Sequence, residues 1–102
     1  MNDAARAGGF AASDDGRQWV YAGTLTFANA ETVLEGSRTL PLPSGGVADL
    51  SGLAHADSAA LAVLLALRRR AEAEGTKLAF ASVPDTLVSL ARVYGIDALV
   101  GL

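Results

Sequence analysis

The pair Asp57-Ser58 stands immediately before a long run of small and apolar residues, and this position decides what its side chains can do. The run that starts at Ala59 predicts a helix, so Ser58 lies at a helix N-terminus. Backbone N–H groups there lack intrahelical partners, and the helix dipole presents partial positive charge. A hydroxyl at such a position can cap the helix, accept a phosphoryl group or contact another protein. The residues alone leave these three roles open.

The other polar residues near this pair do not form a recognisable catalytic or metal site. Asp49 and Asp57 are two carboxylates that could act as an acid and a base, but no nucleophile, Lys or His is spaced to join them. His55 is the one histidine of the chain, and a lone histidine beside scattered carboxylates does not predict a metal site. Gly45-Gly46 lacks the spacing of a nucleotide-binding loop. We therefore expect an exposed loop position for His55, and no catalytic residue, metal or cofactor.

Tyr94 and the run Arg68-Arg69-Arg70 each have two interpretations. Tyr94 continues an apolar stripe at helical spacing, which favours a place in the core. A tyrosine on a last helical turn can also bury its ring and present its hydroxyl to a partner. The three arginines lie in the second half of the long predicted helix, where cations complement the dipole. We expect a solvated helix end there in preference to a phosphate or lipid patch.

Composition and charge exclude several classes of protein. A length of 102 residues with 51% hydrophobic and 19% charged residues predicts one folded domain. The net charge of −3 argues against a nucleic-acid binder. Without cysteine there is no disulfide framework, which fits a reducing cytoplasm. The chain starts without the basic and apolar regions of a secretory signal, and its longest apolar run, residues 59–67, is too short to span a bilayer. We predict no direct membrane insertion.

The elements that position these residues alternate between strand and helix. We expect residues 1–16 to form a flexible N-terminal leader, with order beginning near Arg17. The predicted strands are 19–22, 24–27, 47–50 and 77–82, and the predicted helices run from 29 or 30 to 38, from 58 to about 74 with Gly75 as C-cap, and from Pro84 to Gly95. This alternation predicts an α/β fold with largely parallel strands. Its ligands would lie beyond the carboxyl ends of the strands, where the loop 51–58 lies.

The segment from Val47 to Val100 resembles the STAS domain family, which includes anti-sigma factor antagonists and transporter-associated modules. The residues that carry the resemblance are Asp49-Leu50-Ser51-Gly52-Leu53, Asp57-Ser58, Leu61-Ala62-Val63-Leu64-Leu65, Glu74-Gly75, Lys77-Leu78-Ala79-Phe80 and Val83-Pro84. Within the family, the stretch from Leu90 to Asp97 together with Leu99 is most similar to the MlaB type, the small cytoplasmic STAS subunits of phospholipid ABC transporters. The resemblance covers about half of the chain.

This resemblance implies a STAS domain over residues 17–102, with a four- or five-stranded mixed sheet and helices packed on it. It implies a non-catalytic cytoplasmic subunit, peripheral to the inner membrane through its partner. That partner is an MlaF-like ATPase, and through it a membrane permease complex that maintains outer-membrane lipid asymmetry. Ser58 matches the hydroxyl position that lies at the partner surface in the family, and we expect partner binding through His55, Asp57, Ser58 and Tyr94. The alternative is an anti-sigma factor antagonist that is switched by phosphorylation at Ser58.

One departure from the family pattern bears on this choice. Anti-sigma factor antagonists commonly have Ser and then Gly after the phosphorylated hydroxyl residue, whereas this chain has Ala59 and Ala60. Two alanines strengthen the start of the helix and remove the flexible residue beside the acceptor. The departure therefore weighs against phosphorylation of Ser58 more than against partner binding.

Overall fold

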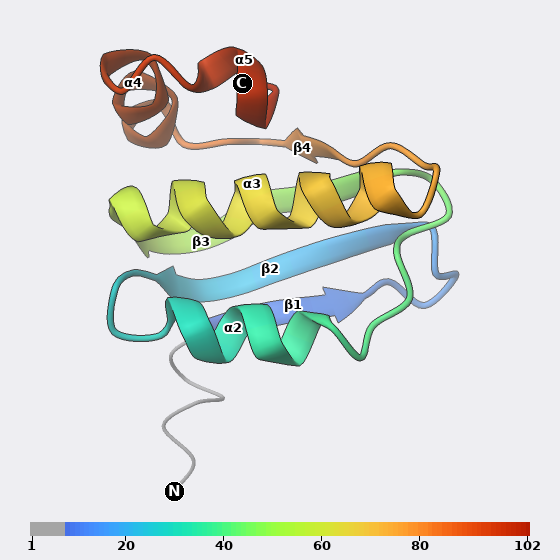
Figure 1. Ribbon diagram of the computed structural model, residues 1–102. Coiled ribbons are helices and arrows are strands. Elements are labelled where there is room, and N and C mark those ends of the chain that lie inside the picture. Colours follow the sequence, from blue (N-terminus) through green and yellow to red (C-terminus); the bar gives the residue numbers. More distant parts are fainter. Residues whose placement is uncertain (1–7) are drawn as a thin grey trace, which may run out of the picture.

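Strands β1 (Gly8–Ala12), β2 (Gln18–Leu25), β3 (Val47–Ala56) and β4 (Ala79–Ala81) form one sheet in that order in the computed structural model, which describes residues 8–102 (Figure 1). The helices are α2 (Ala30–Ser37), α3 (Ser58–Ala73), α4 (Asp85–Val93) and the short α5 (Asp97–Val100). Strand β1 runs antiparallel to β2, while β2, β3 and β4 are parallel. The predicted α/β class with a mixed sheet of four or five strands is confirmed.

The helices cover one face of this sheet. Crossovers between neighbouring parallel strands have a fixed right hand, so α2, between β2 and β3, and α3, between β3 and β4, lie on the same face. The two helices contact each other, and α4 and α5 extend the helical layer beyond β4 through contacts with α3 (Figure 1). Because β2 and β3 point the same way, α2 and α3 both return antiparallel to them, and their N-termini lie at the same edge of the sheet.

The core fills the space between the sheet and its helices. Along β2 the buried side chains Trp19, Tyr21 and Leu25 face the helices, whereas Val20 faces away and is 39% exposed. This alternation is typical of a sheet with one face buried and one face open. From α3 the core receives the buried stripe Ala60, Leu61, Val63, Leu64, Leu67 and Ala71.

The expected leader is wrong for residues 8–16. Gly8–Ala12 is strand β1, and Phe10 lies opposite Tyr21, with ring centroids 4.7 Å apart. The turn that follows is held by Asp15, whose carboxylate accepts from the Arg17 amide at 3.0 Å and from the Ser13 hydroxyl at 2.8 Å. These two hydrogen bonds lower the pKa of Asp15. The remaining part of the expected leader, residues 1–7, lies outside the described residues.

Other elements also differ from the prediction. The two strands expected on either side of Gly23 are one strand, β2, because this glycine adopts a φ of 101° within it. Strand β3 continues to Ala56, so most of the expected 51–58 loop belongs to this strand, which pairs with β2 at Gly52, Leu53 and Ala56. The strand predicted over 77–82 is limited to Ala79–Ala81, and α5 was not predicted. These differences move His55 from a loop into a strand.

Candidate functional site: the N-terminal end of α3

Asp57 is the N-cap of α3. Its backbone is extended, with φ −127° and ψ −167°, and its Oδ1 accepts a hydrogen bond from the Ala59 amide at 2.9 Å. Its Oδ2 accepts from the Phe27 amide at 3.1 Å. One carboxylate therefore satisfies an amide at the start of α3 and also fixes the turn that leads from β2 into α2.

Ser58 is the first residue of α3 and is exposed to solvent. Within residues 8–102 its hydroxyl has no hydrogen-bond partner, because Asp57 already serves as the cap. Ser58 is therefore not the cap of α3, and the two remaining roles from the sequence are phosphate acceptor and contact with another protein. The hydroxyl is free to meet a group from outside the chain.

His55 and Asp49 flank the bulged middle of β3. Asp49 accepts from the Ser51 amide at 2.9 Å and from the Ser51 hydroxyl at 3.1 Å, so its carboxylate is bound locally. His55 is exposed, as expected, although it lies in the strand and not in a loop. Across the part of the chain that the structure describes, no cluster of His, Cys, Asp or Glu could hold a metal ion. Asp49 and Asp57 therefore serve different local structures and do not share one site.

Phe27 belongs to this end of α3 but was predicted to lie in a strand. Its side chain is 85% exposed, although its amide is bound to Asp57. Beside it, a hollow of about 400 Å³ opens between α2 and α3, lined by Phe27, Ala30, Glu31, Leu34, Ala59, Ala62 and Val63. The only signal in the sequence is a bulky apolar residue between the strand run and the first helical residue, outside the stripe of either element. An exposed aromatic beside an apolar hollow is typical of a protein contact.

Tyr94 leaves the core stripe that its spacing predicted. Leu87 and Ala91 of α4 are buried, but the helix ends at Val93 and Tyr94 is its C-cap, 56% exposed. Val93 is 80% exposed and Leu99 60%, which gives the α4–α5 corner an exposed apolar surface. Because α4 packs against α3, Tyr94 and Ser58 lie on neighbouring helices of one layer (Figure 1).

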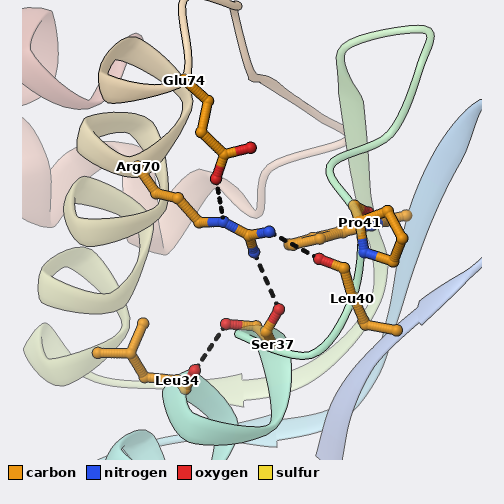
Figure 2. A network of polar contacts seen from close by, with 7 residues as sticks. Leu34, Ser37, Leu40, Pro41, Arg70 and Glu74 are labelled. Atoms are coloured by element: carbon orange, nitrogen blue, oxygen red, sulfur yellow. Dashed lines mark hydrogen bonds and ion pairs between the residues drawn. The ribbon is translucent and has the colours of Figure 1, made fainter.

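Two of the three arginines of α3, Arg69 and Arg70, have different environments. Arg69 is exposed, whereas the side chain of Arg70 is partly buried and joins α3 to the end of α2 (Figure 2). Its guanidinium donates to the carbonyls of Ser37 at 3.0 Å and Leu40 at 2.8 Å, and its Nε donates to Glu74 at 2.9 Å. It thereby caps the C-terminal end of α2 from a neighbouring helix. The expected solvated helix end is wrong for this residue.

Comparisons with known proteins agree with this arrangement. The family model described as "Mlab, STAS domain" matches residues 13–101, which is most of the chain. A search of curated proteins finds no match. Among the described residues, no helix has both the length and the apolar character needed to cross a membrane. The family match includes the turn before β2 and extends through α5.

Proposed function

Because this chain belongs to the STAS domain family, of the MlaB type, we propose that it binds and regulates the ATPase of a phospholipid-transporting ABC complex. STAS domains are generally non-enzymatic and commonly mediate protein–protein interaction. The protein would then be a cytoplasmic subunit, held at the inner membrane by its MlaF-like partner and the permease complex. The partner-binding residues of this proposal are His55, Asp57, Ser58 and Tyr94.

The observation that carries the proposal is the exposed, unbonded hydroxyl of Ser58 on a helix end that Asp57 already caps. A group with no role in its own fold, next to the exposed ring of Phe27, supports a surface that is completed by another protein. Regulation follows if the chain binds one conformation of the ATPase more tightly than another. The equilibrium then shifts by the difference in the two binding free energies.

The substitution Ser58→Asp tests this function. Asp57 remains the cap, so we expect the variant to fold with an unchanged melting temperature. A second carboxylate in a desolvated contact would lack a partner, and binding to the ATPase should weaken by several kcal/mol. The control is Ser44→Asp, because Ser44 is an exposed serine in the turn before β3, away from Ser58, and its hydroxyl makes only a long hydrogen bond of 3.4 Å to the Gly16 carbonyl. Co-elution with the ATPase and ATP turnover of the complex are measured for the wild type and both variants.

The second candidate function is a phosphorylation switch at Ser58, as in anti-sigma factor antagonists. The exposed hydroxyl at a helix N-terminus favours it, since a phosphate would lie at the positive end of the helix dipole. The adjacent Asp57 carboxylate and the two following alanines oppose it. Capture of a small kinase and a sigma factor in place of an ABC ATPase would select this function. Normal ATPase binding by Ser58→Asp would remove Ser58 from the partner surface.

A further inference from the structure

We propose that the groove between α2 and α3 holds an amphipathic helix of the ATPase partner, in addition to the contacts at the α3 N-terminus. This inference rests on the proposed function for the partner's identity and adds a second surface and the chemistry of its occupant. The hollow of about 400 Å³ beside Phe27 is followed along the same two helices by one of about 410 Å³. Leu34 lines both hollows, so they adjoin each other along the seam between α2 and α3, and we call the two together the groove.

The walls of this groove suit a helix. Ala59, Ala62 and Ala66 of α3 recur at i, i+3 and i+7, which places three small side chains along one face. Small residues allow the axis of a third helix to approach closely, and Leu34 and Val63 supply apolar surface beneath it. The eight residues of α2 give the groove a length of about 12 Å, enough for about two helical turns.

The two ends of the groove carry opposite charges. Glu31 lines the end near Asp57, whereas Arg38, Arg69 and Arg70 line the other end. Arg38 is paired with Glu35 at 3.4 Å and Arg70 with Glu74, but Arg69 has no ion-pair partner among residues 8–102. We therefore assign an acidic first turn to the incoming helix, next to Arg69. This direction also sets its dipole antiparallel to those of α2 and α3.

Phe27 provides an anchor at the opposite end of the groove. Its ring is almost fully exposed while its backbone is fixed through Asp57, so it would lose little backbone freedom when a partner covers it. Asp57 links the groove to Ser58, because the carboxylate that holds Phe27 also caps the helix that Ser58 begins. The groove is therefore continuous with the proposed partner surface.

The experiment measures the affinity of the full chain for the ATPase subunit of the same organism by biolayer interferometry. Ala62→Arg fills the groove from an exposed helical position, and we expect at least about a tenfold loss of affinity. Ala73→Arg makes the same change at an exposed position of α3 outside both hollows, and its affinity should equal that of the wild type. Circular dichroism melting confirms that both variants fold.

A second pair of variants tests the direction of the helix. Arg69→Glu should weaken binding about tenfold at low salt and less at high salt, whereas Arg17→Glu, on the exposed β1–β2 turn, should have no effect. An unchanged affinity for Arg69→Glu would overturn the acidic first turn.

If the wild type binds the ATPase and Ala62→Arg binds equally well, the groove proposal fails while the proposed function stands. If the wild type binds no ATPase, both fail. Self-association that Ala62→Arg abolishes, with ATPase binding intact, would assign the groove to a second copy of the chain.

Discussion

At the level of single residues, buried polar side chains fix the turns that surround the core. The indole N–H of Trp19 donates to the Pro41 carbonyl at 2.9 Å, and the Tyr21 hydroxyl donates to the Thr24 carbonyl. Asn29 donates to the same Thr24 carbonyl and accepts from the Thr26 amide. No buried side-chain polar atom among the described residues lacks a partner. The core therefore holds its loops through specific hydrogen bonds as well as through apolar packing.

The phenol of Tyr21 makes stability depend on pH at the alkaline end. Burial raises the pKa of Tyr21 from 10.0 to about 12, so the folded state holds its proton more tightly than the unfolded state does. Its contribution is complete below pH 10 and is lost as the pH rises to 12, a change of about 3 kcal/mol. Denaturant titrations from pH 9 to 12 should show a steeper loss of stability for the wild type than for Tyr21→Phe. Parallel curves would contradict this assignment.

Alanine substitutions at two glycines should change the stability of the fold in opposite directions. A Cβ at Gly52 would lie 2.3 Å from the Tyr21 carbonyl oxygen, where β3 passes close to β2. Gly52→Ala should therefore destabilise the fold by about 2–4 kcal/mol. Gly36 lies inside α2 with open space around it, so Gly36→Ala should stabilise by up to about 1 kcal/mol. Free energies of unfolding from urea titrations decide both, and a neutral Gly52→Ala would mean that the two strands can separate at no cost.

At the level of elements, local signals were sufficient for α2 and α3 and insufficient for α5 and for parts of the sheet. Helix α3 was predicted to within one residue at its end, because its apolar spacing and its Gly75 stop signal are local. Strand β1 was missed because Gly8–Ala12 has little strand propensity, and it forms by pairing with β2 across a turn. The apolar spacing favoured a core position for Tyr94, yet α4 ends at Val93 and the Tyr94 side chain stays 56% exposed.

The sequence predicted only part of the candidate site. Asp57 and Ser58 are placed by the start of a strongly apolar helix, which a sequence shows directly. Phe27 and the groove depend on how α2 and α3 come together after folding, and no local pattern encodes that distance. Arg70 was assigned to solvent because its partners, Ser37 and Leu40, lie about 30 residues earlier in the chain. Contacts between residues so far apart in the sequence can be identified only once the fold is known.

The connection between α2 and α3 through Arg70 gives a prediction at this scale. Arg70→Met keeps part of the aliphatic stem but leaves the Ser37 and Leu40 carbonyls without their charged donor, and it removes the guanidinium that lies 5.9 Å from the Trp19 ring centroid. We expect a loss of about 2–3 kcal/mol. Arg69→Met is the control on the same helix, because Arg69 is exposed, and it should change stability by less than about 0.5 kcal/mol. Equal melting temperatures for the two variants would show that Arg70 does not hold α2.

At the level of the whole molecule, all the described helices lie on one side and leave the other face of the sheet open. The exposed large apolar side chains on the helical side are Phe27, Val93, Tyr94 and Leu99. Phe27 lies at the N-terminal end of α2 and α3, while the other three lie at the α4–α5 corner. A partner that covers both regions would bury apolar surface that the fold itself leaves in water.

Tyr94 tests whether the partner extends to that corner. Since its side chain is 56% exposed, Tyr94→Ala should change the melting temperature little, whereas binding to the ATPase should weaken by about 2 kcal/mol if the ring is a hot spot. Leu87→Ala is the contrasting variant, because Leu87 is buried in the same helix and its loss should lower stability by about 2–5 kcal/mol. Unchanged ATPase affinity in a well-folded Tyr94→Ala variant would confine the interface to the region around Ser58.

The burial of Trp19 also gives the molecule an internal optical reporter. It is the one tryptophan of the chain, and its indole is fully buried among core side chains, bound to Pro41 and close to Arg70. Indole emission moves to longer wavelength when water reaches the ring, so the emission maximum follows opening of the core. Substitutions at Ser58, Ala62 and Tyr94 do not involve the hydrogen bond of this indole. Fluorescence of the isolated variants can therefore separate a lost contact with the partner from a lost fold, without any added label.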